Sequence, residues 1–475
     1  MYNGIQYQIQ DILTHLKYYK MTKRREFLKQ TVLGSAGLAI GGMDLSARSY
    51  RSVQGANDRI NVAVVGIRGQ GGTHISNFAL LKESKNVGII VLCDADEEYF
   101  PGRVKNVLDQ TDETPATVWD MRRVFDNRDV HVVSFATPNH WHALGTIWAC
   151  QAGKHVYVEK PACHTVLEGR KMVDASRKYN VRVQTGFQNR SIHGVMDAIK
   201  FLHDGGIGDV FMAKGLCFKP RDSFGISSDS TPPESLHYDI WLGPAAWQPY
   251  NEKKTHYNWH WHWNTGGGDT ANQGPHQFDI ARWGMNKHEH PVTIYSMGNI
   301  FGIDPEECSQ ETPNTQTSLF KYKDGKILEF ETRGRYTHAE AGLEIRIGNM
   351  FYGTEGYLEI DGGKWKAYRR RESKPFAGSD VGEKPDDPTF MAPPGDSAHY
   401  ANFIDAVRSG KNQDLHCDIL DGYLSSALPA LANISYKLKR QLTFDGANEK
   451  FVKDKEADKL LTREYRKPYV VPEVV

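Results

Sequence analysis

The sequence predicts an α/β fold: a doubly wound parallel sheet, followed by an α+β domain with a large, mostly antiparallel open sheet. Two observations support this expectation. Between residues 58 and 188, short Val- and Ile-rich runs alternate with segments whose apolar residues have helical spacing, as in parallel strands joined by helices. Beyond about residue 190 the runs are longer and alternate apolar with polar residues, which is typical of antiparallel strands with one solvated face.

The elements of the parallel sheet follow one another in a regular order. DRINVAVVGIRGQGGTH (58–74) contains a strand and a Gly-rich turn, and a helix is expected to start at THISNFALLK. GIIVLCDAD (88–96) is the next strand and ends in acidic residues. VHVVSFATP, HVYVEKP and VRVQTGFQ supply further strands, with helices predicted in WHALGTIWACQAGK and KMVDASRKYN between them.

The second half begins with a predicted helix, GVMDAIKFLHDGGIG, and continues in strands. These are expected in GDVFMAKGLCF, HPVTIYSMGNI, TQTSLFKYKDGKILEFETR, GLEIRIGNMFYGTEGYLEIDGG and KWKAYRR, where KDGK and GTEG have the composition of turns. From about residue 397 the pattern is helical again, in SAHYANFIDAVRSGK and LDGYLSSALPALANISYKLKR. The polar segment 441–475 is expected to wrap the surface.

Composition restricts the class of partner. The chain has 475 residues, of which 39% are hydrophobic and 24% charged, as in ordinary globular proteins. Lys plus Arg and Asp plus Glu both number 58, so the net charge is zero and neither nucleic acid nor a membrane surface is an expected partner. The six cysteines show no CxxC pair or metal-ligand spacing, so we expect buried thiols and no metal site.

The first 55 residues are expected to be an export signal and linker. TKRREFLKQ (22–30) is a twin-arginine run, followed by the apolar TVLGSAGLAIGG and by LSA (45–47), which resembles a cleavage site. The apolar stretch is too short and Gly-rich for a stable membrane span, which favours periplasmic export by the twin-arginine (Tat) route over an uncleaved anchor. Met21 directly precedes this signal and is an alternative start of the chain.

The Gly-rich turn is a candidate dinucleotide site. Such a turn between a strand and a helix lets the backbone approach a pyrophosphate closely. Gly66, Gly69 and Gly71 supply it here, but Arg68 stands where the usual G-x-G-x-x-G pattern has its second glycine. Asp94, at the end of the second strand, is placed to accept hydrogen bonds from an adenosine ribose, which favours NAD over NADP. Arg68 keeps NADP possible, because a guanidinium in this turn can pair with either phosphate group.

Several motifs together resemble the glucose-fructose oxidoreductase and inositol dehydrogenase (Gfo/Idh/MocA) family. The Gly-rich turn, CDAD, TPNHWH, EKP and NQGPHQFD occur here in the family's order, and the resemblance runs from about residue 58 to 440. It implies an N-terminal Rossmann domain, placed at 56–185, and a C-terminal substrate and oligomerisation domain, placed at 186–440. It also implies a homo-oligomer formed through the open sheet. The polar segment 441–475 beyond the resemblance is expected to be a C-terminal extension.

The resemblance also implies which residues surround the cofactor. Thr137, Pro138, Asn139 and His142 are expected to line its nicotinamide side, and the EKP motif is expected to lie beside it. In the family the Lys of this motif, here Lys160, holds the substrate hydroxyl and supports proton transfer, which suits a partly desolvated ammonium. The complete cofactor set expected is Gly66, Arg68, Gly69, Gly71, Asp94, Thr137, Pro138, Asn139, His142, Glu159, Lys160, Pro161 and Gln188.

A second motif, NTGGGDTANQGPHQFDIARWGM (264–285), is expected to supply the other catalytic groups. The family pattern D-x-x-x-H places an Asp and a His one helical turn apart, and this chain has Asn272 and His276 there. His276 would be the general base, with a pKa near the working range. Asn272 can orient a hydroxyl or the His but carries no negative charge, for which Asp269 or Asp279 is a possible compensation.

The substrate pocket is expected to include HYNWHWHWN (256–264), because Trp and His rings suit the apolar faces and hydroxyls of a sugar. His260 and His262 could face one side, but without a third ligand we expect no metal. The candidate substrate residues are Arg190, Tyr238, Trp261, His262, Asp269 and Asp279.

The leading hypothesis is therefore an exported NAD-dependent oxidoreductase that acts on a secondary alcohol of a sugar or sugar derivative and keeps its cofactor tightly bound. Two alternatives remain open. One is a glycosidase that oxidises a sugar carbon, eliminates the aglycone and reduces again with no net redox change. The other is a non-catalytic binding protein with a Rossmann shell, for which Asn272 and Arg68 are the supporting departures. A measurement of net redox change would separate the oxidoreductase from the glycosidase.

Overall fold

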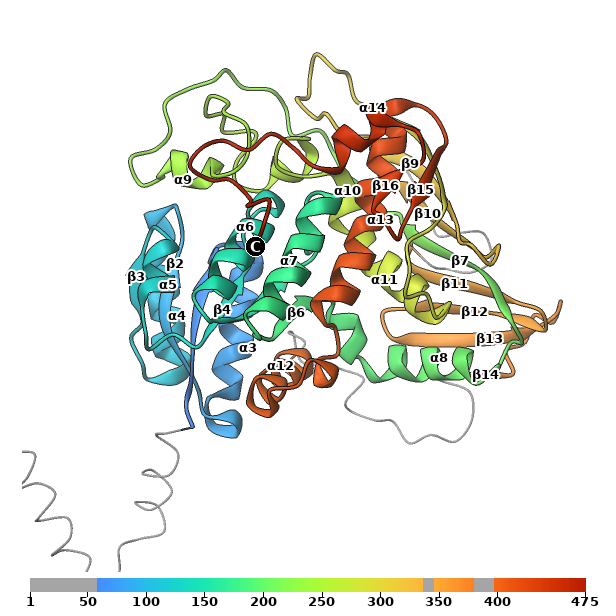
Figure 1. Ribbon diagram of the computed structural model, residues 1–475, viewed down its shortest axis with the longest axis horizontal. Helices are drawn as coiled ribbons and strands as arrows, with labels where there is room; N and C mark the ends of the chain where they lie inside the picture. Colours follow the sequence, from blue (N-terminus) through green and yellow to red (C-terminus); the bar gives the residue numbers. More distant parts are fainter. Residues whose placement is uncertain (1–57, 336–345, 380–396) are drawn as a thin grey trace, which may run out of the picture. The chain divides into compact units, whose positions relative to one another are not determined.

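The first sheet has six parallel strands in the order β3-β2-β1-β4-β5-β6 (Figure 1). The structure is a computed structural model that describes residues 58–335, 346–379 and 397–475, and the expected export signal lies outside these residues. Because the order reverses beside β1, the carboxyl ends of β1 and β4 flank the crevice where ligands bind in such sheets. The strands are β1 (Ile60–Val65), β2 (Val87–Cys93), β3 (Ala116–Val118), β4 (Val132–Phe135), β5 (His155–Glu159) and β6 (Val183–Gly186).

Helices connect these strands, as the alternation of the sequence predicts. They are α3 (Gly69–Lys85), α4 (Phe100–Thr111), α5 (Arg122–Asp126), α6 (Asn139–Gln151) and α7 (Val166–Lys178). The sequence predicts that this first helix starts at Thr73, but α3 begins at Gly69. Glycine is a poor helix former, but a Cβ on Gly71 would lie 1.8 Å from the carbonyl oxygen of Gly66. This close approach, which only glycine allows, outweighs the propensity.

The second sheet has ten strands in the order β14-β13-β12-β11-β7-β10-β9-β8-β15-β16. Strands β7 and β10 pair in parallel, and the other neighbours pair antiparallel, so the prediction of a large, mostly antiparallel sheet is confirmed. The strands are β7 (Val210–Cys217), β8 (Thr293–Asn299), β9 (Thr315–Lys321), β10 (Ile327–Arg333), β11 (Ile347–Gly353), β12 (Gly356–Asp361), β13 (Lys364–Arg369), β14 (Ala377–Gly378), β15 (Leu442–Asp445) and β16 (Lys450–Phe451).

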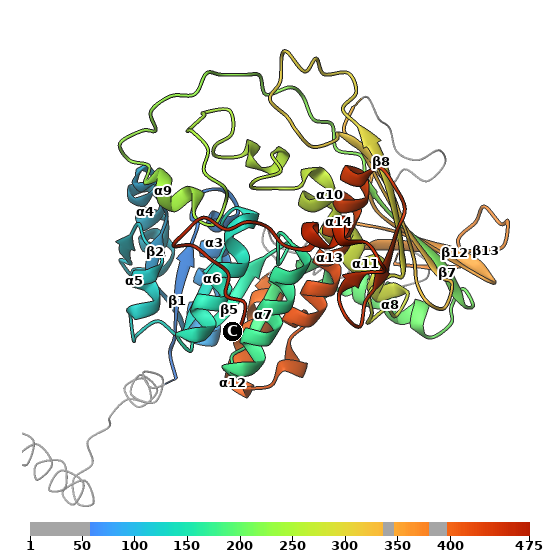
Figure 2. The same cartoon turned by 45° about the horizontal axis from the view of Figure 1, so that its top comes forward.

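Helices from both halves of the chain lie between the two sheets. Figures 1 and 2 show α7 and α13 side by side there, with α6 and α11 next to them. One cluster of buried apolar side chains continues from the parallel sheet through these helices to the second sheet. The remaining α-helices are α8 (His193–His203), α9 (Tyr238–Leu242), α10 (Gly268–Asn272), α11 (Gly274–Gly284), α12 (Ser397–Ser409), α13 (Ile419–Leu438) and α14 (Lys455–Asp458), and the short 3-10 helices are η1 (Glu97–Tyr99), η2 (Gln188–Ser191), η3 (Asn258–Trp261), η5 (Asn412–Asp414) and η6 (Lys459–Leu461).

Two C-terminal segments are not where a linear division of the chain would place them. Helix α12 packs against α3, and its Tyr400 and Phe403 belong to the same buried cluster as Phe78. The extension after residue 440 does not merely wrap the surface, because β15 pairs with β8 and its Leu442 and Phe444 are buried. The alternation of four residues in β15 was too short to distinguish a strand from polar coil.

The segment between β7 and α10 crosses from the second sheet to the carboxyl end of the first. Figure 2 shows it reaching α9, beside β2 and α4. Backbone hydrogen bonds fix it there: the Glu97 N–H donates to the carbonyl of Ser235 over 2.9 Å, and the His237 N–H donates to that of Ala95 over 2.8 Å. The second half of the chain therefore supplies a wall of the crevice at the end of the parallel sheet.

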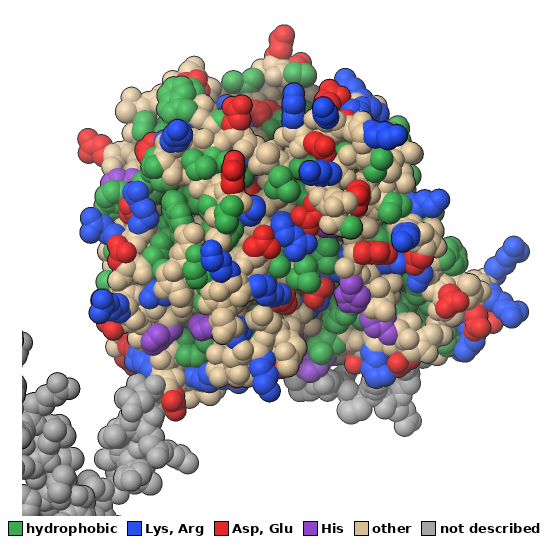
Figure 3. Space-filling view, viewed as in Figure 1, with side chains coloured by type: hydrophobic (Ala, Val, Ile, Leu, Met, Phe, Trp, Pro, Cys, Tyr) green, Lys and Arg blue, Asp and Glu red, His purple; other side chains and the backbone are tan. Residues whose placement is uncertain are grey.

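The surface carries charges of both signs, and the cysteines are buried. On the face in Figure 3, Lys and Arg side chains are interspersed with Asp and Glu. All six cysteines are free and buried. Within the described ranges, no helix combines the length and apolar character needed to cross a membrane, and no group of three or more His, Cys, Asp or Glu side chains is arranged to hold a metal ion.

Arg190 and Asp279, two of the predicted substrate residues, form an interior ion pair. The Arg190 guanidinium donates to both carboxylate oxygens of Asp279 over 2.7 and 2.8 Å, and both side chains are at least 90% buried. The Ser425 hydroxyl donates to Asp279 over 2.7 Å, so the carboxylate is fully engaged. Neither side chain lines the cavity described below. Sequence alone could not separate a buried pair between η2 and α11 from a pair of pocket residues.

This buried pair should contribute strongly to stability. Asp279→Asn leaves the Arg190 charge buried without its bidentate partner, so we expect the free energy of unfolding to fall by about 3–5 kcal/mol. The matched control is Asp405→Asn, because Asp405 pairs with Lys85 but its side chain is 54% exposed. That change should cost about 1 kcal/mol or less. Chemical denaturation of both variants tests the difference, and equal losses would contradict it.

Candidate active site

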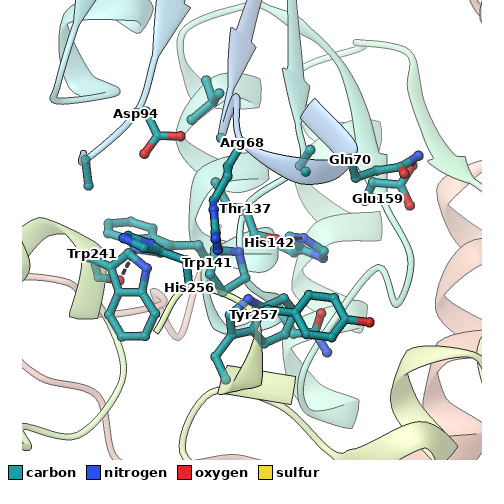
Figure 4. Close-up of a pocket in the computed structure, with 18 of the residues that line it drawn as sticks. Arg68, Gln70, Asp94, Thr137, Trp141, His142, Glu159, Trp241, His256 and Tyr257 are labelled. Atoms are coloured by element: carbon teal, nitrogen blue, oxygen red, sulfur yellow. Dashed lines mark hydrogen bonds between the residues drawn. The ribbon is translucent and has the colours of Figure 1, made fainter. Parts of the chain in front are cut away.

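A cavity of about 690 Å³ lies at the carboxyl ends of β1, β2, β4 and β5 (Figure 4). This is where ligands bind in doubly wound sheets. Its walls come from both halves of the chain. The lining residues are Val65, Gly66, Arg68, Gly69, Gln70, Cys93, Asp94, Ala95, Trp119, Met121, Ala136, Thr137, Pro138, Asn139, Trp141, His142, Glu159, Lys160, Gln188, Ile240, Trp241, His256, Tyr257, Trp259, His260, Asn272 and His276.

The glycine-rich turn packs closely against neighbouring backbone and leaves room for a ligand. Gly66 has a φ of +80°, and a Cβ there would lie 2.8 Å from the backbone carbon of Ala136. Gly69, the first residue of α3, has nothing within 4 Å of its Cβ position. Arg68, Gly69 and Gln70 line the cavity, so the N-terminus of α3 lies at its wall, where a helix end favours a pyrophosphate.

Asp94 and Arg68 mark the adenosine side of the cavity. The Asp94 carboxylate accepts hydrogen bonds from the backbone N–H of Ile67 over 2.8 Å and of Asp96 over 3.0 Å. Burial raises the pKa of Asp94 to about 6, against the opposing effect of these bonds. Figure 4 shows the Arg68 side chain extending from the turn into the cavity. A carboxylate for ribose hydroxyls and a guanidinium for phosphate thus fit NAD.

The turn after β4 contains a further group that suits a cofactor. The Thr137 hydroxyl is buried and has no hydrogen-bond partner within the protein. An unpaired buried hydroxyl on a cavity wall is suited to a ligand that completes its hydrogen bonds. His142, in contrast, directs Nδ1 to the carbonyl of Pro161 at 2.7 Å and Nε2 to that of Thr137 at 2.8 Å. It holds the β4 and β5 turns together.

The Glu159 carboxylate is the centre of a buried hydrogen-bond network. Its Oε1 accepts from Gln188 Nε2 over 2.8 Å and lies 3.1 Å from Nε2 of His74, whose Nδ1 is 2.7 Å from the Ser134 hydroxyl. Burial alone would raise the pKa of Glu159, but the His74 contact and nearby positive charges lower it to about 2. Glu159 is therefore an anion that ties β5 to α3, β4 and η2.

Lys160 and His276 face the opposite end of the cavity from Asp94. Lys160 Nζ donates to the backbone carbonyl of Asn272 over 2.9 Å, and burial lowers the pKa of this ammonium. His276 Nδ1 is buried without a hydrogen-bond partner. Burial, and then the charge of Lys160, lower the pKa of His276 to about 3. The ring is thus neutral near pH 7, and the expectation of a pKa in the working range is wrong.

Family comparisons agree with this geometry. Residues 60–187 match the model described as "Oxidoreductase family, NAD-binding Rossmann fold", and residues 225–471 match "Oxidoreductase family, C-terminal alpha/beta domain". The chain belongs to the Gfo/Idh/MocA oxidoreductase family. Its N-terminal domain is an NAD-binding Rossmann domain.

Curated relatives match parts of the chain. A levoglucosan dehydrogenase from Pseudarthrobacter phenanthrenivorans is 40% identical over 96 residues, which cover 20% of this chain and 25% of the relative. A glycosyl hydrolase family 109 protein from Shewanella baltica is 28% identical over 172 residues, covering 33% and 37%. The chain thus spans about a quarter to two fifths of the length of these relatives.

Solved structures match over more of the fold. A levoglucosan dehydrogenase in complex with NADH and levoglucosan has a TM-score of 0.63 at 18% identity and covers 81% of this chain and 99% of its own. An aldose-aldose oxidoreductase from Caulobacter crescentus, complexed with glycerol, has a TM-score of 0.59 at 18% identity and covers 81% and 100%. These similarities show the shared fold.

The structure brings together most of the predicted cofactor and catalytic residues. The predicted residues that line the cavity are Gly66, Arg68, Gly69, Asp94, Thr137, Pro138, Asn139, His142, Glu159, Lys160, Gln188, Asn272 and His276. Gly71 packs behind the turn, and Pro161 lines a neighbouring cavity of about 460 Å³.

None of the six predicted substrate residues lines this cavity. Tyr238 donates to the carbonyls of Gln248 and Pro249, each over 3.1 Å. Trp261 is buried beneath the Arg221 guanidinium. His262 is buried 3.3 Å from Glu311.

Asp269, the last of this group outside the Arg190 and Asp279 pair, is buried and bound to Arg221. It lies directly behind the lining residue Asn272, whose side-chain amide donates to it over 3.3 Å. It therefore acts on the site through its neighbours.

Several lining residues were not predicted from sequence. His74 beneath the lining was also missed, although its position one turn beyond the glycines could have indicated a side chain that reaches the sheet. The missed lining residues include Gln70, Trp119, Met121, Trp141 and Ile240. The aromatic HYNWHWHWN segment correctly indicated His256, Tyr257, Trp259 and His260, but the two residues selected from it as substrate candidates, Trp261 and His262, do not line the cavity.

The crossing segment closes the adenosine side of the cavity. His256 Nε2 lies 3.0 Å from the Asp96 carboxylate, and His237 Nε2 lies 2.6 Å from that of Glu97. The His237 ring stacks on Trp119 with centroids 4.2 Å apart. Since Asp96 and Glu97 follow directly after the Asp94 turn, these contacts join the segment to the ribose side of the NAD site.

We expect these two contacts to slow the release of NAD. The double variant His256→Ala/His237→Ala should release NADH about 10- to 100-fold faster, because each lost charge-assisted hydrogen bond corresponds to roughly 1.5–3 kcal/mol at most. Stopped-flow fluorescence of bound NADH measures the rate. His203→Ala is the control, since that exposed ring bonds to the Trp283 carbonyl on α11. An unchanged rate in the double variant would show that the segment does not retain the nucleotide.

Proposed function

We propose that this protein is an NAD-dependent oxidoreductase that converts a secondary alcohol of a sugar or sugar derivative into a ketone and keeps its cofactor bound between turnovers. The observation that carries the proposal is the position of the Lys160 ammonium. It lies in the same cavity as the Gly-rich turn and Asp94, beside a neutral His276. The relatives named as sugar dehydrogenases support a carbohydrate substrate.

Bound NAD supplies the two-electron acceptor, so that the alcohol carbon gives up a hydride and the hydroxyl gives up a proton. The lowered pKa of Lys160 makes its neutral amine accessible: the ammonium would first release a proton to solvent, and the amine would then accept the proton of the substrate hydroxyl. The carbonyl of Asn272 holds the ammonium in place, a role that does not require the carboxylate usual at this position.

His276 is better suited to relay a proton than to keep it. A ring with a pKa of about 3 accepts a hydrogen bond near pH 7 but does not remain protonated. We therefore assign the retained proton to Lys160, and to His276 the orientation of a substrate hydroxyl. This division reverses the roles expected from the motif alone.

Lys160→Met tests the proposal. The variant should bind NADH as tightly as the native protein, because the adenosine and pyrophosphate groups of the site are unchanged. Its kcat should fall about 10²- to 10⁴-fold, the usual contribution of a general acid–base group. Lys105→Met, on the exposed surface of α4, is the control. Near-native turnover of Lys160→Met, measured as nicotinamide reduction with a sugar substrate, would overturn the assignment.

A second candidate function is a glycosidase that oxidises and re-reduces its substrate with no net redox change. His260 favours it. Its Nδ1 lies 2.5 Å from the Tyr257 carbonyl, and burial lowers the pKa of the ring to about 3, so the proton is on Nδ1 and Nε2 is a free acceptor. An acceptor of this kind on the cavity wall would relay a proton from the carbon next to a transient ketone, as His276 does in the first proposal, without keeping it. Relatives named glycosyl hydrolase family 109 proteins support this candidate.

We further propose that the chain is exported to the periplasm by the Tat route with its cofactor already bound. The basis is the twin-arginine run at 22–30, which lies outside the described residues. Export after folding is consistent with a site whose adenosine side is closed by the contacts of His256 and His237.

A homo-oligomer through the open face of the second sheet is also proposed. The face turned away from α11 and α13 exposes Met297, Leu319 and Ile327, whose exposed fractions are 56, 41 and 38%. Apolar side chains grouped on one sheet face are typical of a surface that another subunit covers.

A further inference from the structure

Three cations lie close to the catalytic end of the cavity. Lys160 lines it, Lys219 bonds to Gln273 beside the lining residue Asn272, and Arg221 bonds to Asp269 behind Asn272. The carboxylates at this end are those of Glu159 and Asp269. The balance of two carboxylates against three cations leaves a net positive charge, before the positive nicotinamide of NAD is added.

Both carboxylates are already committed. Asp269 accepts from Arg221 Nε over 2.9 Å and from Nη2 over 2.8 Å, and it is 3% exposed. Glu159 is held in the network of His74 and Gln188. Arg221 is therefore neutralised by Asp269, and Glu159 is turned toward α3 and η2.

The two lysines bond to neutral groups. Lys160 Nζ donates to the Asn272 carbonyl over 2.9 Å, and Lys219 Nζ donates to the side-chain oxygen of Gln273 over 2.6 Å. Among the described residues, neither lysine forms an ion pair with a carboxylate, although Lys214 on β7 is paired with Glu329 and Glu331. Lys160 is required at the reacting hydroxyl, so Lys219 is the cation left for another substrate group.

We propose that the substrate is a sugar acid, a hexuronate or its glycoside, and that Lys219 binds its carboxylate. This inference rests on the proposed oxidoreductase function of the same site. Lys219 is half-buried directly after β7, and its partner Gln273 is the neighbour of the lining residue Asn272. Lys219 does not itself line the cavity, but it reaches the lining through Gln273, which lies in the chain between Asn272 and the start of α11, the helix of His276.

Electrostatics favours an anion here over a neutral hydroxyl. A partly desolvated ammonium bound only to an amide loses hydration without gaining a counter-charge. A carboxylate would form a charge-assisted hydrogen bond with Lys219 and offset the repulsion between it and Lys160. One uncompensated ammonium matches a single negative charge, whereas phosphate groups are usually bound by several donors or by a bidentate Arg.

Equilibrium binding to the NADH-loaded protein tests the proposal. Calorimetry would compare matched pairs of methyl hexuronides and methyl hexosides of the gluco, galacto, manno and gulo series, together with the corresponding hexose 6-phosphates. We expect one hexuronide to bind at least 10-fold more tightly than its hexoside and its phosphate. Lys219→Gln should weaken that hexuronide about 10- to 100-fold and leave the hexoside unchanged, and Lys219→Arg should restore part of the affinity.

Lys214→Gln is the control, since it removes a lysine of the preceding strand β7 whose carboxylate partners, Glu329 and Glu331, lie on the sheet. Equal loss for hexuronide and hexoside in Lys219→Gln would overturn the proposal, as would preference for a hexoside or a phosphate, or no binding of any hexuronide. Oxidation of neutral sugars by the native protein would then show that the oxidoreductase function stands and only the sugar-acid inference fails. Absence of oxidation with every sugar would count against both.

Discussion

The buried Glu159 carboxylate is the interaction on which the site depends. Its charge is held below the sheet edge by His74 from α3 and Gln188 from η2, while Ser134 on β4 supports His74. Because it lies directly before Lys160, the same anion that locks the three elements together fixes where the ammonium emerges. A Cβ on Gly186 would lie 2.7 Å from this carboxylate, so even the neighbouring strand is shaped around it. Catalytic geometry and packing therefore cannot vary independently here.

Much of the fold and of the cofactor site could be predicted from sequence, because these features depend on local constraints. Strand and helix periods identified both sheets, the glycines marked the close approach at Gly66 and Gly71, and Asp94 and the EKP residues fall where parallel strands end. The short elements β3, α5 and β15 were missed, since three to five residues carry too little pattern, and the longer α4 was missed as well.

The substrate side was predicted less well, because it depends on contacts between distant segments. Arg190 and Asp279 satisfy each other in the interior, and Trp261 packs under Arg221, which no spacing in the sequence could reveal. The same holds for the closing of the adenosine side by His256 and for the charge left on Lys219. The lowered pKa of His276 also depends on the tertiary structure, since burial and the charge of Lys160 cause it.

The measurement that bears most directly on the central claim is net redox change in a single reaction. The purified protein, with the nucleotide it retains, would be incubated with a panel of sugars and aryl glycosides, and nicotinamide absorbance and released aglycone would be followed together. If the protein is a sugar oxidoreductase, reduced nicotinamide accumulates in proportion to the ketone formed, and no aglycone is released. Release of aglycone with no net change in nicotinamide would contradict this function and support the glycosidase cycle.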